Sequence, residues 1–121
     1  MNIRQQLVVF DAPDLAAESS FWAALTGGTV EPDGDDWHTV RVDGEPRLAV
    51  QLAPDHVRPG WPAGTPQQLH LDLYVDDIRA AHEEAVSLGA ELLRAADDLD
   101  AKSGFQVYAD PAGHPFCLCW G

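Results

Sequence analysis

The feature that most constrains the fold of this chain is a weak internal repeat with an offset of 63 residues. When Leu7–Phe10 is aligned with His70–Leu73, Asp14 falls on Asp77. Each half then reads as a short apolar strand, an aspartate, a helix and a glycine. A fixed long period indicates two copies of one supersecondary unit. The sequence therefore predicts two related modules.

Both predicted helices carry their own start and stop signals. Asp14 and Asp77 are N-cap candidates, because a carboxylate accepts from the free N–H groups of the first helical turn. Gly27 and Gly89 stand where a left-handed residue ends a helix. The second helix is amphipathic, and we expect its His82 to be solvated on the outer face.

Strands are predicted from period-two alternation of apolar residues. They lie at Leu7–Phe10, Trp37–Val42, Arg47–Leu52, Leu69–Val75, Glu91–Leu93, Phe105–Ala109 and Phe116–Trp120, with a further short strand ending at Val30. Residues 54–66 contain four prolines and two glycines, which a central strand or helix does not tolerate. We therefore expect one α+β domain over 1–121, with module one at 1–53, a Pro-rich linker at 54–66 and module two at 67–121. The predicted order of elements in each module is βαβββ.

Alternation also assigns the two faces of each strand. In the strand Phe105–Ala109, it places Phe105 and Val107 against the helix, and Gln106 and Tyr108 on the opposite face. The candidate ligand-binding residues, all assigned to faces away from the helices, are Trp37, Thr39, Arg41, Gln51, His70, Asp72, Tyr74, Gln106, Tyr108 and Cys117. A mixed polar and aromatic surface is typical of a small-molecule pocket. The alternative is a surface that faces solvent or a partner chain.

Charge excludes several function classes. Seven Lys and Arg residues against 20 Asp and Glu residues give a net charge of −13, so the basic surface that nucleic acids or anionic membranes require is missing. No apolar run approaches the roughly 18 residues of a membrane-spanning helix. Cys117 and Cys119 are too close along a strand to favour a disulfide. We expect a cytoplasmic protein whose charge favours cationic small molecules.

Three segments resemble the vicinal oxygen chelate superfamily, in its glyoxalase-like and bleomycin-resistance-like branch. They are LVVFDAPDLAAESSFWAALTGG in the first half, and HLDLYVDDIRAAHEEAVSLGAEL and VYADPAGHPFCLCW in the second. The resemblance implies two βαβββ modules whose mixed sheets form a cup with the helices on its outer face. It also implies a homodimer, and in the enzymes of the family a divalent metal held by the first strand and a late strand of each module.

The metal ligands of the family carry over poorly. His70 matches a ligand position of the family. Leu7 stands where the first strand of the family's first module has His or Gln, and Cys117 stands where its second module has a late Glu. At the late position of the first module, only Gln51 could coordinate a metal. This set suits Mg²⁺ and Mn²⁺ badly, because these ions prefer carboxylate oxygens, although Zn²⁺ accepts imidazole and thiolate. We therefore expect neither a catalytic metal nor another cofactor.

Three functions are consistent with these residues. The first is binding of a small, cationic or aromatic molecule without catalysis, as in the drug-sequestering resistance proteins of the family. The second is a metal-dependent lyase, isomerase or dioxygenase. The third is a metal-free enzyme in which His70 and Asp72 are the candidate catalytic residues and Cys117 is a candidate nucleophile.

Overall fold

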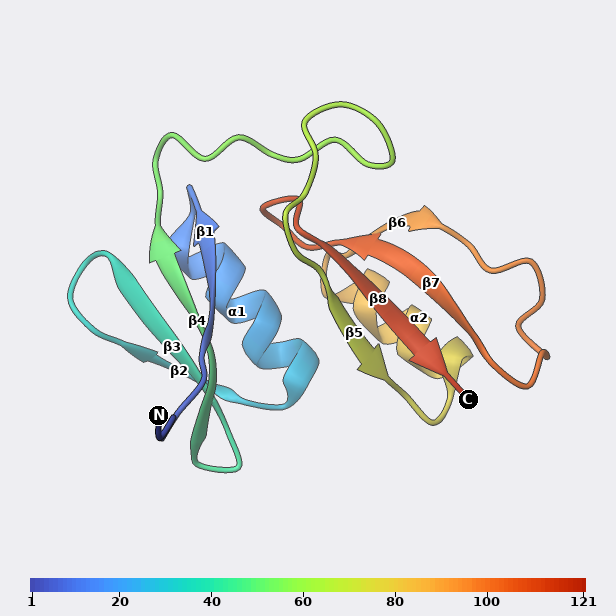
Figure 1. Ribbon diagram of the computed structural model, residues 1–121, viewed down its shortest axis with the longest axis horizontal. Helices are drawn as coiled ribbons and strands as arrows, with labels where there is room; N and C mark the ends of the chain where they lie inside the picture. The colour runs from blue at the N-terminus through green and yellow to red at the C-terminus, as the bar shows by residue number, and fades with distance from the viewer. The chain divides into compact units, whose positions relative to one another are not determined.

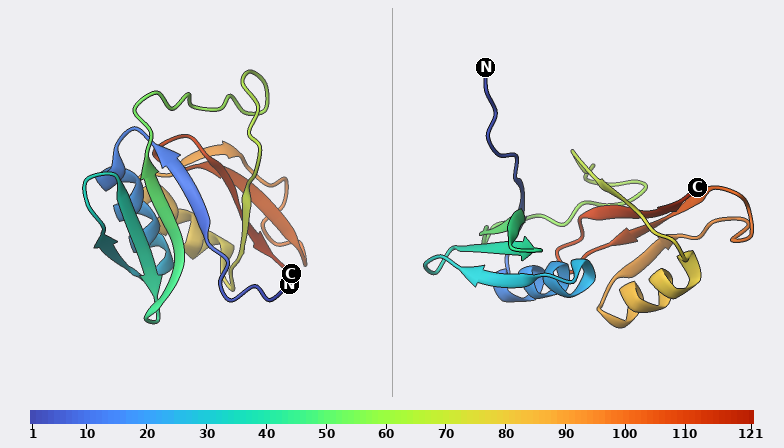
Figure 2. Two further views of the ribbon diagram at one scale, coloured as in Figure 1. Left: turned by 60° about the vertical axis from the view of Figure 1, so that its left-hand side comes forward. Right: turned by 90° about the horizontal axis from the view of Figure 1, so that it is seen from below.

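The computed structural model describes all residues from Met1 to Gly121 and separates them into two compact units, Met1–His56 and Val57–Gly121 (Figure 1). Each unit contains one helix and four strands in the order βαβββ. Figure 2 shows that the helix of each unit lies on one side of its own sheet. The predicted α+β class and the order of the elements are confirmed. No helix is long and apolar enough to cross a membrane.

The first unit contains β1 (Val8–Ala12), α1 (Leu15–Thr26), β2 (Thr29–Pro32), β3 (Trp37–Val42) and β4 (Glu45–Leu52). Its sheet has the strand order β1-β4-β3-β2, in which only β1 and β4 run parallel. Asp14 caps α1 by accepting from Ala17 N at 2.9 Å, and Gly27 ends the helix with a φ of 70°. Both predicted capping residues of this helix are therefore confirmed.

The core of the first unit is built around Trp22, whose side chain is fully buried. Its indole stacks on Phe10 of β1 with ring centroids 4.9 Å apart and meets the ring of Phe21 edge-on at 5.4 Å. The indole Nε1 donates to Glu18 Oε1 at 3.1 Å. On the same side of the sheet, Ser19 Oγ lies 2.7 Å from His38 Nδ1. Aromatic stacking and paired polar groups thus hold α1 against β1 and β3.

The second unit contains β5 (Leu71–Tyr74), α2 (Ile78–Ser87), β6 (Glu91–Arg94), β7 (Gly104–Ala109) and β8 (Pro115–Trp120). Its strand order is β5-β8-β7-β6, with β5 and β8 parallel. Asp77 caps α2 by accepting from the backbone N–H groups of Arg79 and Ala80. Gly89 follows the helix with a φ of 109°. The start and stop signals of the second helix are confirmed as well.

The ends of the strands differ from the predicted ones by at most two residues. The largest change that concerns the site is at β5, which was expected from Leu69 and begins at Leu71, so that His70 precedes the strand. The parallel ladder starts with Leu71 opposite Phe116. The preceding residue of β8 is Pro115, which has no N–H to extend the ladder.

Hydrogen bonds and an ion pair hold residues 58–65 of the Pro-rich segment within the second unit. Arg58 Nη1 donates to Pro111 O at 2.9 Å, and Arg58 Nη2 lies 3.3 Å from Glu91 Oε2. Gly60 N donates to Thr65 O at 2.7 Å and closes a small loop. This loop carries Trp61, which packs against a buried cluster of the sheet. The module and linker limits drawn from the sequence stay a prediction.

Candidate ligand pocket

The face of the second sheet that points away from α2 carries two rows of side chains. The register aligns Asp72 of β5, Cys117 of β8 and Val107 of β7 in one row. It aligns Tyr74, Cys119 and Phe105 in the next row. Because side chains two residues apart in a strand share a face, both rows project to the same side.

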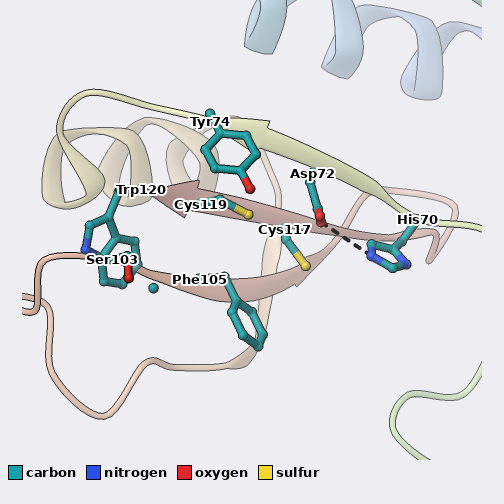
Figure 3. A pocket seen from close by; sticks show the side chains of 10 residues that line it. His70, Asp72, Tyr74, Ser103, Phe105, Cys117, Cys119 and Trp120 are labelled. Atoms are coloured by element: carbon teal, nitrogen blue, oxygen red, sulfur yellow. Dashed lines mark ion pairs between the residues drawn. The ribbon is translucent and has the colours of Figure 1, made fainter.

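A pocket of about 500 Å³ opens over these two rows (Figure 3). Its lining residues are His70, Asp72, Tyr74, Ser103, Gly104, Phe105, Cys117, Cys119, Trp120 and Gly121. The two cysteines are buried, whereas the residue Tyr74 is 74% exposed and the residue Phe105 is 49% exposed. The pocket thus combines a floor of two thiols with aromatic walls and one carboxylate.

His70, Asp72 and Cys117 form the polar end of the pocket. His70 Nε2 lies 3.4 Å from Asp72 Oδ1, and both side chains are about half exposed (48% each). Burial raises the pKa of the Cys117 thiol to about 12, and the hydrogen bond to Asp72 and the charge of that carboxylate add to the rise. Burial also raises the pKa of Cys119. At neutral pH both thiols are therefore uncharged, and Cys117 donates to the Asp72 carboxylate.

These three residues are a poor match for the hard divalent cations Mg²⁺ and Mn²⁺. One donor atom from each of His70, Asp72 and Cys117 lies within 4.8 Å of the others. Only one of the three is a carboxylate, so Mg²⁺ and Mn²⁺ are poorly served. Zinc accepts imidazole, carboxylate and thiolate, but it would have to displace the proton that the buried Cys117 thiol holds at neutral pH. The donor set is therefore a poor match for Mg²⁺ and Mn²⁺, and zinc binding would carry the cost of deprotonating a buried thiol.

The assignment of faces in β7 was wrong. Gln106 and Tyr108 are buried on the side of α2, and Phe105 lines the pocket. The Tyr108 hydroxyl accepts from Gln106 Nε2 at 2.8 Å and lies 2.8 Å from His82 Nδ1 of α2. Gln106 Oε1 in turn accepts from Ala96 N at 3.1 Å. His82 is thus half-buried and bonded to the sheet rather than solvated, and this network, not an apolar residue, covers the inner face of β7.

The candidates of the first unit lie on the face of its sheet opposite α1. Trp37 and Gln51 are cross-strand neighbours, and Trp37 Nε1 donates to Thr39 Oγ1 at 3.1 Å. Arg41 is engaged in other contacts, since its Nε lies 2.6 Å from Glu31 Oε2 and its Nη1 donates to Gly44 O. Leu7 precedes β1. The structure thus groups Trp37, Thr39 and Gln51 in one unit, and His70, Asp72, Tyr74 and Cys117 in the other.

Sequence reasoning missed the pocket walls Phe105, Ser103 and Trp120. The indole of Trp120 lies over Gly104 and donates from Nε1 to Ala101 O at 2.9 Å. The signal that could have found it is Gly104 itself, because a glycine within a strand often marks a close approach.

Gly104 holds Trp120 in place. A Cβ on Gly104 would stand 2.5 Å from Cζ2 and 2.6 Å from Cη2 of the Trp120 ring, so Gly104→Ala must displace a rigid indole. We expect this variant to lose about 1–3 kcal/mol of unfolding free energy through overpacking and to shift the Trp120 indole N–H resonance. The measurement is urea denaturation combined with ¹H–¹⁵N NMR. Unchanged stability together with an unshifted Trp120 resonance would contradict this placement of the ring.

Comparison with known proteins places this geometry in a family. A family model described as a glyoxalase-like domain matches residues 7–119. A search of curated proteins found no significant match. The fosfomycin resistance protein FosX of Listeria monocytogenes, in its tetragonal crystal form, superposes with a TM-score of 0.76 at 13% identity, covering 100% of this chain and 93% of that chain.

Two further solved structures have the same fold. A glyoxalase-related enzyme from Fulvimarina pelagi gives a TM-score of 0.71 at 22% identity, covering 98% of this chain and 89% of that chain. A glyoxalase/bleomycin resistance protein/dioxygenase family enzyme from Burkholderia phytofirmans gives 0.71 at 15% identity, covering 94% and 95%. At such identities the likeness concerns the fold alone. Together with the family match over nearly the whole length, the βαβββ order of both units shows that the chain belongs to the glyoxalase-like domain family of the vicinal oxygen chelate superfamily.

Proposed function

We propose that this protein binds a small organic cation carrying an aromatic group in the pocket of the second unit, without a resident metal. One observation carries the proposal: the exposed carboxylate of Asp72 stands between the exposed ring of Tyr74 and the half-exposed imidazole of His70 in a pocket that Phe105 also lines. A carboxylate beside aromatic faces is the arrangement that organic cations favour. Large exposed rings in a pocket also favour a ligand that covers them.

Charge and size agree with this proposal. A net charge of −13 raises the local concentration of cations around the protein. The volume of about 500 Å³ lies within the range that drug-sized ligands occupy. Retention of such a ligand needs no catalytic group, and mass action suffices for sequestration.

The protonation of Cys117 argues against covalent chemistry in this pocket. The attacking species of a cysteine nucleophile is the thiolate, and a pKa of about 12 leaves a minute thiolate fraction at neutral pH. The polar end of the pocket therefore supports binding better than nucleophilic attack.

The contact of 3.4 Å between His70 and Asp72 favours one second candidate, a metal-free reaction in which His70 removes a proton from a bound molecule. The substitution His70→Gln separates the two functions. A binding protein keeps its affinity for cations within a few fold in this variant, because the carboxylate of Asp72 remains. An enzyme of the second kind keeps binding its substrate but stops converting it.

The test of the binding function is an NMR titration with benzyltrimethylammonium, compared with benzoate and benzyl alcohol at constant ionic strength. We expect saturable shifts at Asp72, Tyr74 and Phe105 with the cation alone. In Asp72→Asn, the affinity for the cation should fall about tenfold, because a charged partner at the pocket surface becomes a neutral one.

The matched control is Glu83→Gln, which removes an exposed carboxylate from α2 and thus the same charge from the same unit. This variant should bind the cation as the original chain does. An equal loss of affinity for the cation in Asp72→Asn and Glu83→Gln would mean that the effect comes from the net charge alone. Equal binding of benzoate and the cation would overturn the proposed function.

The assembly belongs to the same proposal. We propose that the protein forms the homodimer that the family resemblance implies, and that it acts in the cytoplasm. Multi-angle light scattering of the purified chain tests the first point. A mass near the 13.1 kDa of one chain at micromolar concentration would contradict it.

A further inference from the structure

We infer that Trp61 makes this pocket prefer aromatic cations to aliphatic ones. This inference rests on the proposed binding function and adds the residue that determines which cations are accepted. Trp61 does not belong to any strand or helix. It comes from the Pro-rich segment, residues 54–66.

The position of Trp61 follows from its contacts with the pocket floor. Its side chain packs against the buried cluster of Val107, Cys117 and Cys119, and both cysteines line the pocket. In the sheet, Cys117 lies between Val107 of β7 and Asp72 of β5. Trp61 is not one of the residues that line the pocket, but it packs against the cluster that supplies the floor, whereas Asp72 reaches the pocket from β5.

The indole of Trp61 is only partly buried, so the cluster does not use its whole surface. Asp72 and Cys117 stand opposite each other on neighbouring strands, so a cation paired with Asp72 would lie beside the Cys117 position. An aromatic group attached to that cation can extend across the floor toward the indole. Tryptophan has the largest flat surface of the aromatic side chains, and an aromatic group of the ligand can stack on it.

The loop that carries Trp61 is held in place before any ligand arrives. Arg58 is bonded to Pro111 O in the turn between β7 and β8 and to Glu91 of β6. The side chain of Arg58 crosses directly over Gly113 of the same turn, where a Cβ would overlap its Cγ. The bond from Gly60 N to Thr65 O closes the loop around Trp61. A side chain fixed in this way costs little entropy when a ligand packs on it.

The experiment compares two cations that differ only by an aromatic group, benzyltrimethylammonium and tetramethylammonium, titrated by ¹H–¹⁵N NMR. We expect the original chain to bind the benzyl compound about fivefold more tightly. In Trp61→Ala this preference should disappear while the affinity for tetramethylammonium stays the same. Trp61→Phe should keep most of the preference, and it serves as the second variant if Trp61→Ala unfolds.

The matched control is Leu93→Ala. Leu93 packs against the same cluster from β6, so its removal loosens the cluster without removing an aromatic surface. This variant should keep the preference for the benzyl compound. Loss of the preference in Leu93→Ala, or equal weakening of both cations in Trp61→Ala, would show a structural role and overturn the inference.

The failure of this inference and that of the proposed function give different results. If the original chain binds neither cation, the proposed function is wrong. If it prefers the benzyl compound and Trp61→Ala keeps that preference, the pocket binds cations as proposed and only the role of Trp61 is wrong.

Discussion

Cys117 should react with iodoacetamide at pH 8 about a thousandfold more slowly in the folded protein than in the protein unfolded in urea. The thiolate is the reacting species, and a rise in the pKa from 9.0 to about 12 lowers its fraction by roughly three orders of magnitude. The direction follows from the causes of the rise. Burial, the hydrogen bond to Asp72 and the charge of that carboxylate all stabilise the protonated form.

The measurement is the alkylation rate of each cysteine by peptide mass spectrometry between pH 7 and 10. The folded-state rate at Cys117 should still be climbing at pH 10, since the pKa lies above that value. Asp72→Asn removes one acceptor and one negative charge, so it should lower the pKa and speed alkylation. A rate at Cys117 that levels off below pH 9 would mean an activated thiolate, and it would revive the nucleophile hypothesis.

Trp22→Ala should cost about 3–5 kcal/mol of unfolding free energy, the range for removing a large, fully buried aromatic side chain. The variant loses the stack on Phe10, the edge contact with Phe21 and the hydrogen bond to Glu18. Small domains are stable by only about 5–15 kcal/mol, so a loss of this size removes a large part of the stability.

Urea denaturation followed by circular dichroism measures this loss. Trp22→Phe keeps an aromatic ring for Phe10 to stack on and should cost clearly less than Trp22→Ala. A loss below 1 kcal/mol in Trp22→Ala would mean that the first unit does not depend on this aromatic core.

The fold could be predicted well because its signals are local. Asp14, Gly27 and Asp77 mark the helices through backbone chemistry that operates within one turn. On β8, alternation predicted that Cys117 faces away from the helix, and the structure confirms that face.

The error on β7 has one physical cause. The prediction assumed that Phe105 would be buried and that Gln106 and Tyr108 would face outward. Polar side chains can occupy a core face when they satisfy one another, and the groups of Gln106, Tyr108 and His82 do so. A partner 26 residues away, such as His82 for Tyr108, leaves no trace in the alternation of a single strand.

The candidate site could be predicted only where the spacing of residues along a strand indicates it. His70, Asp72 and Tyr74 follow from their spacing along the chain. Ser103 comes from a loop, and only tertiary packing brings it into the lining of the pocket. Whether the residues of the pocket bind a ligand stays a prediction.

The strand order β5-β8-β7-β6 has a consequence for how the protein folds during its synthesis on the ribosome. The first strand of this unit has no neighbour in its sheet until the last strand is available, since β8 separates β5 from β7. Pairings between such distant segments form late in folding. Asp72 and Cys117 therefore meet only when the final strand inserts. A nascent chain that does not yet include β8 exposes β5 as an open edge for which chaperones and other chains compete, and the pocket forms in the same step that removes this hazard.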